Sequence, residues 1–139
     1  AQILALLQEL RDAFGMSMLF ISHDLSVVRA VSNRIMVLYL GRIVELGDAD
    51  AVCSDPRHPY TQALISAVPI PNPDIERNRS RIRIPGELPS PMDPRAALRF
   101  MPSKLDAGNM YYEPALMDVA PGHLVAEHDP LEAILDRRG

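Results

Sequence analysis

Three adjacent residues, Ser22, His23 and Asp24, carry the side-chain types of a hydrolase triad. A triad needs its groups to lie along one line of hydrogen bonds, and consecutive residues at a strand end point in different directions, so we reject this interpretation. His23 remains a candidate by itself. It follows a short apolar run, and open α/β sheets bind ligands at the carboxyl ends of their strands. The alternative is a partly buried imidazole that hydrogen-bonds to the backbone.

Other ligand-type side chains form weaker combinations. Two pairs have the donor types of a metal site, Cys53 with His58 and His123 with His128. Neither pair has a third and a fourth ligand near it in the sequence, so we expect no metal site. Four alternating arginines would share one face of a strand, which suits an acidic partner, with a solvated strand face as the alternative. These are Arg77, Arg79, Arg81 and Arg83.

Composition and motifs exclude several classes of function. The chain of 139 residues has a formal net charge of −4, which argues against nucleic acid as a partner. Its single cysteine cannot form an internal disulfide. No apolar run approaches the ~20 residues of a membrane helix, and the first residues do not resemble a signal peptide. Neither G-x-x-x-x-G-K-[ST] nor G-x-G-x-x-G occurs, so neither loop is present to cradle nucleotide phosphates.

The elements around His23 follow from the spacing of apolar residues. A helix is predicted over residues 3–14 and ends at Gly15. After it come a buried strand over 18–21, a helix over 25–31 capped by Asp24 or Ser22, a buried strand over 35–40, and a returning hairpin strand over 42–46. This alternation is typical of an α/β domain with a parallel sheet.

Two buried strands do not complete such a sheet. We therefore expect the first third to be the end of a larger domain, and the start at Ala1, inside a helical pattern, fits a fragment. The apolar strands would then be exposed, so we expect the isolated chain to be marginally stable or oligomeric.

The rest of the chain is rich in proline. All thirteen prolines lie at or after Pro56, which predicts a loop-rich region with short elements. A short helix is predicted over 60–68. A last helix is expected to begin at Pro130 with Asp129 as its cap and Glu132 reaching back, and its apolar face would be Leu131, Ile134 and Leu135.

Four segments carry a family resemblance. Residues 2–45, QILALLQELRDAFGMSMLFISHDLSVVRAVSNRIMVLYLGRIVE, resemble the last part of the ATP-binding subunit of an ABC transporter. Residues 55–74, DPRHPYTQALISAVPIPNPD, are similar to the C-terminal extension of its oligopeptide/dipeptide importer subfamily, as are GELPSPMDP at 86–94 and PGHLVAEH at 121–128.

This resemblance implies a fold and a division of the chain. The fold class is α/β: the C-terminal end of an ABC-type nucleotide-binding domain, followed by a proline-rich, loop-rich extension with short strands and helices. Residues 1–54 would belong to the ATP-binding domain, 55–128 to the extension, and 129–139 to a short terminal helix.

The resemblance also implies roles for individual residues. His23 matches the switch histidine, which contacts the γ-phosphate of ATP and helps to arrange the attacking water, and it is the expected catalytic and cofactor-binding residue. Tyr39, Gly41 and Arg42 match a structural hairpin. His58, Pro59 and Tyr60 match the signature of the extension, where we expect them to fix a loop onto a helix.

The function implied is energising the import of oligopeptides, dipeptides or nickel, by hydrolysis of ATP with Mg²⁺ in the complete subunit. The phosphate-binding loop, signature sequence and Walker B carboxylates of the family would all precede Ala1. We therefore expect this chain to be inactive as an enzyme by itself. The alternative is a non-catalytic docking module or the decayed remnant of such a subunit.

The partners implied are transmembrane permease subunits and a second ATP-binding subunit, on the cytoplasmic face of the inner membrane. Many relatives also hold an iron–sulfur cluster through four cysteines in the extension. Here those positions fall at Leu98, Lys104, Tyr111 and Glu127, none of which supplies a thiolate. We therefore expect no cluster, and apolar packing or a looser loop in its place.

Overall fold

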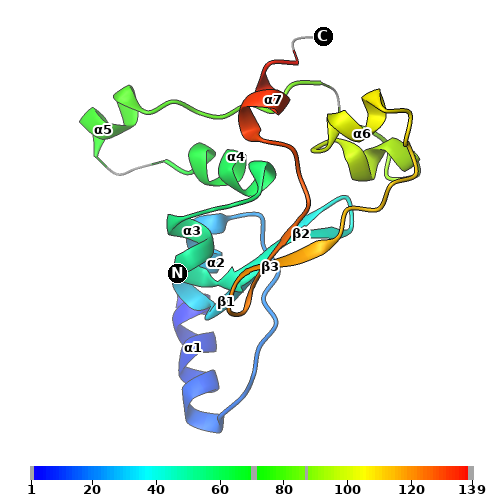
Figure 1. The fold of residues 1–139 in the computed structure, drawn as a ribbon. Coiled ribbons are helices and arrows are strands. Elements are labelled where there is room, and N and C mark those ends of the chain that lie inside the picture. Colours follow the sequence, from blue (N-terminus) through cyan, green and yellow to red (C-terminus); the bar gives the residue numbers. More distant parts are fainter. Residues whose placement is uncertain (1, 70–71, 87, 138–139) are drawn as a thin grey trace.

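The structure is a computed structural model that describes residues 2–69, 72–86 and 88–137 (Figure 1). It contains short helices and one sheet. The helices are α1 (Gln2–Phe14), α2 (Leu25–Val31), α3 (Ala49–Ser54), α4 (Pro59–Ala67), α5 (Pro73–Asn78), the 3₁₀ helix η1 (Pro94–Leu98), α6 (Pro102–Asp106) and α7 (Leu131–Leu135). The strands are β1 (Arg34–Tyr39), β2 (Arg42–Asp48), β3 (Leu116–Ala120) and β4 (His123–Ala126).

The sheet is antiparallel throughout and has the strand order β1-β2-β4-β3. The hairpin between β1 and β2 is confirmed, with Leu40 and Gly41 both at positive φ in its turn. The expectation of a parallel sheet is wrong. Strand β2 pairs with β4, so strands from the first third and from the far end of the chain share one sheet (Figure 1).

The predicted buried strand over residues 18–21 is also wrong. These residues form neither helix nor strand, and the side chains of Leu19 and Ile21 are 91% and 88% exposed. A strand buried on both faces needs neighbouring strands and two covering layers, and residues 18–21 pair with no strand of the described sheet. Strand β1 is not buried on both faces either, because its residues alternate between exposed and buried.

The two helices that flank His23 are confirmed. Gly15 follows α1 with a φ of +63°, the left-handed conformation that ends many helices and suits glycine. Asp24 caps α2, since its carboxylate accepts hydrogen bonds from the N–H groups of Ser26 and Val27. Ser22 does not cap the helix directly, but its hydroxyl oxygen accepts from the N–H of Asp24.

Two expectations for the rest of the chain are wrong. The four arginines do not lie on a strand: Arg77 belongs to α5, and Arg79 donates to the carbonyl oxygens of Ile65 and Val68 at the end of α4. Asp129 does not cap the last helix, because its carboxylate accepts from the N–H and hydroxyl of Ser103. The helix over 60–68 is confirmed as α4, which begins one residue earlier.

The core lies against one face of the sheet. Alternate residues of β1 project into it. They pack with Val52 of α3, with Ile134 of α7, and with Phe100, which follows η1. Helices α3 and α4 pack on β2, so this inner face is covered by the segment that directly follows the hairpin and by the last helix. The core therefore joins the two ends of the chain and leaves α1 outside, with no buried residue.

Candidate functional site

His23 lies in the irregular segment between α1 and α2 and is exposed. Its neighbours serve local structure, since Ser22 and Asp24 accept backbone hydrogen bonds at the start of α2. No described residue hydrogen-bonds to the imidazole of His23. The structure therefore shows no triad at residues 22–24, and it leaves the His23 ring accessible to a ligand.

A second group of polar side chains is buried at the centre of the sheet. Glu45 of β2 is fully buried, and its carboxylate accepts hydrogen bonds from three donors. The N–H of His58 lies 2.8 Å from Oε1, and the N–H of Arg57 lies 3.1 Å from the same atom. His123 of β4 places Nε2 2.7 Å from Oε2. We call these four residues the Glu45 cluster; it joins β2, the start of α4 and β4.

His58 caps helix α4 with its ring. Its Nδ1 accepts from the N–H of Tyr60 at 3.1 Å, so this nitrogen carries no proton and the neutral ring is protonated at Nε2. Burial, and to a smaller extent the neighbouring His128, lowers the pKa of His58 to about 3. Pro59 occupies the first helical position, where its missing N–H has no helical partner to lose.

Aromatic rings fix the third residue of the His-Pro-Tyr signature. Tyr60 packs edge-on against Tyr39 of β1, with ring centroids 4.8 Å apart, and Phe100 packs against both Tyr39 and His58. The hydroxyl of Tyr39 accepts from Arg99 at 2.6 Å. These contacts support the expectation that the signature fixes a loop onto a helix, because its side chains are directed into the core.

Close packing also restricts the residue opposite His123. A Cβ atom on Gly47 would lie 3.1 Å from Cγ of the His123 ring, closer than ordinary van der Waals contact. The imidazole ring of His123 passes over Gly47, which has no side chain, to reach the carboxylate of Glu45. Gly47 therefore leaves room for the hydrogen-bonding contact between His123 of β4 and Glu45 of β2.

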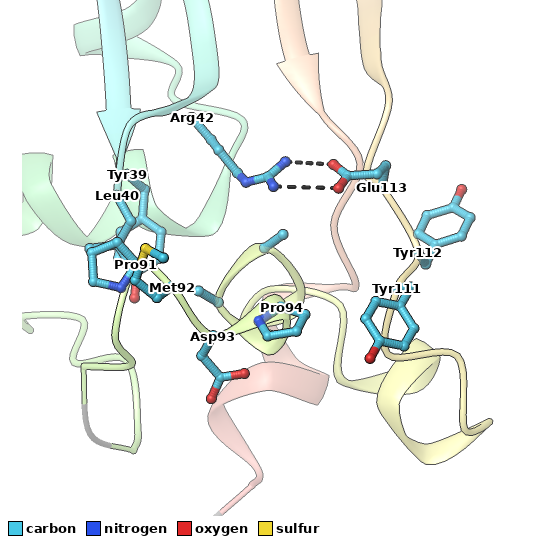
Figure 2. Close-up of a pocket in the computed structure, with 12 residues that line it drawn as sticks. Tyr39, Leu40, Arg42, Pro91, Met92, Asp93, Pro94, Tyr111, Tyr112 and Glu113 are labelled. Carbon is cyan, nitrogen blue, oxygen red and sulfur yellow. Dashed lines mark hydrogen bonds and ion pairs between the residues drawn. The ribbon is translucent and has the colours of Figure 1, made fainter.

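A shallow pocket of about 230 Å³ lies between the β1–β2 turn and the segments around η1 and residues 111–113. Figure 2 shows Arg42 and Glu113 facing each other on one side of it, with N–O distances of 2.5 and 3.4 Å. Met92 and Tyr111 lie on the two sides of the pocket and are largely exposed. The polar side chains that line it are those of Arg42, Asp93, Tyr111, Tyr112 and Glu113.

Comparisons with known proteins show which sequences this chain is similar to. Residues 44–103 match the family described as oligopeptide/dipeptide transporter, C-terminal region. The chain is 53% identical over 100 residues to the oligopeptide transport ATP-binding protein OppF of Salmonella typhimurium, a match that covers 72% of this chain and 30% of the relative. It is 42% identical over 130 residues to the putative oligopeptide transport ATP-binding protein YkfD of Bacillus subtilis, covering 92% and 40%. The chain is therefore similar in sequence to the C-terminal part of oligopeptide importer ATP-binding subunits.

The predicted resemblance is thus confirmed, and the chain spans less than half the length of these relatives. The matched region runs from β2 to α6 and contains Glu45, the His-Pro-Tyr signature and Phe100. The matched region therefore contains three of the four residues of the Glu45 cluster, Glu45, Arg57 and His58, whereas His123 and Tyr39 lie outside it. In the described part of the chain, no helix is long and apolar enough to cross a membrane.

The four positions that the family resemblance aligns with cluster ligands carry Leu98, Lys104, Tyr111 and Glu127, none of which has a thiol. Leu98 is fully buried. The Nζ of Lys104 lies 4.4 Å from the ring centroid of Tyr112, whose hydroxyl donates to Glu127 at 2.8 Å. This donor set does not fit a thiolate-bound cluster. The position of Leu98 is thus filled by apolar packing. Lys104 makes a cation–π contact and Glu127 accepts a hydrogen bond, so these two positions do not form a looser loop.

Metal ligands do not gather elsewhere. Within residues 2–69, 72–86 and 88–137, no group of three or more His, Cys, Asp or Glu side chains could hold a metal ion. The proposed pair of His123 and His128 does not share a site. His123 contacts Glu45, whereas His128 packs against His58 with ring centroids 5.3 Å apart.

Sequence reasoning missed Glu45 altogether. The available signal was an acidic residue between the apolar residues Val44 and Leu46 of the strand. A carboxylate at an inward position requires hydrogen-bond donors. The sequence could not supply their identity, because His123 lies 78 residues further along the chain.

Proposed function

We propose that this chain acts as the C-terminal part of an ATP-binding subunit that energises the import of oligopeptides or dipeptides. The carrying observation is the match to YkfD, which covers 92% of the chain and so includes His23 as well as the His-Pro-Tyr signature. The proposal extends to ATP with Mg²⁺ as the energy source, and to permease subunits and a second ATP-binding subunit as partners at the cytoplasmic face of the membrane.

His23 is the residue that we assign to ATP. Its exposed ring lies directly before a capped helix, at the end of an extended apolar segment. A hydrogen-bond donor aimed at a phosphoryl group stabilises the charge that develops during transfer. The chain offers no glycine loop for the other phosphates, so it does not fit ATP by itself, and we expect no turnover by the isolated chain.

The division of labour along the chain is also part of the proposal. Residues 1–54 would complete the ATP-binding domain, residues 55–128 would form the extension, and residues 129–139 would form the last helix. The pairing of β2 with β4 and the Glu45 cluster support an extension that is built into the domain. In this arrangement the extension stabilises the hairpin that follows the His23 region.

The test is a chimera in which this chain replaces the matching part of Salmonella OppF, assembled with the other subunits of that importer. We expect His23→Ala to lower ATP turnover about 100-fold, the usual effect of losing one transition-state donor. Ser26→Ala, an exposed change on α2, is the matched control and should leave turnover unchanged.

Two results would contradict this proposal. Undiminished turnover by the His23→Ala chimera would favour the alternative of a docking module without a catalytic residue. Turnover by the isolated chain above that of its own His23→Ala variant would show that the chain needs no other part to handle ATP.

A further inference from the structure

Residues 77–83 carry a local excess of positive charge. Four of these residues are arginine and none is acidic, although the whole chain has a formal net charge of −4. Arg79 is engaged at the end of α4, where it donates to two carbonyl oxygens. The side chains of Arg77, Arg81 and Arg83 are exposed. Such a segment on an otherwise acidic chain suits a partner that carries negative charge.

The second half of this segment is extended. The chain leaves α5 and crosses the molecule without folding back, and residues 79–85 form neither helix nor strand (Figure 1). From Arg81 to Ile84 the residues alternate between exposed and partly buried, as expected of a backbone whose side chains point to opposite sides in turn. Ile84 packs against the core, so Arg81 and Arg83 project from the outer side.

One backbone edge of this extended stretch is unpaired. The N–H of Ile82 donates to the hydroxyl oxygen of Ser66 at 2.9 Å, so the edge that contains this group faces α4. In an extended chain, the N–H and C=O groups of adjacent residues point to opposite edges. Those of Arg81 and Arg83 therefore point away from α4, and no described residue hydrogen-bonds to them. We call this the Arg81–Arg83 edge; unpaired groups of this kind are a template for another strand.

The guanidinium groups on the outer side are available to a partner. Arg81 places Nη2 3.6 Å from Oε1 of Glu76, and its side chain is still 55% exposed. Exposed pairs of this kind contribute little to stability, so a carboxylate of a partner can replace Glu76 at small cost. No described carboxylate forms an ion pair with Arg83.

Charge and backbone together specify the partner. We propose that the Arg81–Arg83 edge binds an extended acidic segment of another polypeptide, which adds to it as a β-strand. The two backbones would exchange hydrogen bonds, and alternate Glu or Asp side chains of the partner would lie beside the two guanidinium groups. A nucleic acid suits the edge less well, because its phosphates cannot donate to the unpaired carbonyl oxygens. This binding requires neither ATP nor His23.

The test measures binding of a short fluorescent peptide that alternates Glu and Val to the full 139-residue chain, by fluorescence anisotropy. We expect saturable binding that the double variant Arg81→Glu/Arg83→Glu weakens at least about tenfold, because like charges then face each other. A peptide with Lys in place of Glu should bind the double variant more tightly than the unmodified chain. Arg29→Glu is the matched control, since Arg29 lies on α2 and its side chain is 52% exposed.

Methylation of the peptide's backbone nitrogens separates strand pairing from charge attraction alone. It removes the N–H donors of the peptide and leaves its charge unchanged, so we expect binding to weaken at least about tenfold. Hydrogen exchange gives the location. The amides of Arg81 and Arg83 should exchange more slowly when the unmethylated peptide is bound. Circular dichroism of each variant checks that its fold is unchanged.

Several results would overturn the proposal. One is the absence of binding by the Glu–Val peptide, or equal binding of the Glu and Lys peptides to the unmodified chain. Another is undiminished binding by the double variant. Equal affinity for the methylated and unmethylated peptides would exclude strand addition. A single-stranded DNA oligonucleotide that binds more tightly than the peptide, and only when Arg81 and Arg83 are present, would assign the arginines to a nucleic acid instead.

Discussion

The Glu45 cluster and the segment of residues 17–21 differ in how polarity and burial are combined. Glu45 is a charged residue inside the protein, and all its hydrogen-bonding needs are met by donors from two other parts of the chain. Leu19 and Ile21 are apolar residues in solvent. The first region is satisfied by contacts within this chain, whereas the side chains of the second are exposed in it. Folding stability should therefore depend strongly on the first and hardly at all on the second.

Removal of the Glu45 carboxylate should have the largest effect. Glu45→Ala leaves the N–H groups of Arg57 and His58 without their acceptor and His123 without its partner. We expect the free energy of unfolding to fall by about 3 kcal/mol, as for other buried, hydrogen-bonded charges that lose one partner. Urea denaturation followed by circular dichroism measures this change.

Glu113 provides the control for Glu45. Its ion pair with Arg42 is largely exposed, and such pairs contribute about 0–1 kcal/mol. Glu113→Ala should therefore have a much smaller effect on the denaturation midpoint than Glu45→Ala. Equal losses from the two variants would show that burial of Glu45 does not set its contribution.

Acid should weaken the same region through His58. Its pKa is lowered from 6.5 to about 3 in the folded protein, so between these values the unfolded chain binds a proton that the folded chain does not. Stability from this residue is therefore unaffected above pH 6.5 and falls as the pH drops from 6.5 towards 3. The loss at pH 5 relative to pH 7.5 should be about 2 kcal/mol.

An asparagine at position 58 isolates this contribution. Its side-chain oxygen can still cap helix α4, and it does not titrate. Denaturation curves at pH 7.5 and pH 5 should differ less for His58→Asn than for the unmodified chain. If the two proteins respond equally to acid, the pH dependence comes from other groups.

Sequence reasoning predicted contacts between residues that are close in the sequence and missed contacts between residues that are far apart in it. The helix that ends at Gly15, the cap at Asp24 and the hairpin turn at Gly41 were all predicted, because each depends on residues close together in the chain. The pairing of β2 with β4 was not predicted, since no local pattern specifies a partner 78 residues away. The family signature at His58 was recognised, but its contact with Glu45 was not.

The error over residues 18–21 has a different cause. The apolar run was identified correctly, but burial was inferred from composition alone, and composition does not say whether a neighbouring strand is present. The same reasoning assigned burial on both faces to β1, where only alternate residues are buried. Apolar runs indicate surfaces that need covering, and the structure shows which of them this chain covers by itself.

The smallest expected effect lies in the uncovered segment. Leu19→Asp places a charge where the side chain is already 91% exposed, so the free energy of unfolding should change by less than about 0.5 kcal/mol. Val37→Ala, in the row of β residues that contains Glu45, removes buried methyl groups and should lower it by about 2 kcal/mol. Urea denaturation of the two variants compares the regions directly. A loss from Leu19→Asp as large as that from Val37→Ala would mean that residues 17–21 are buried in the free chain.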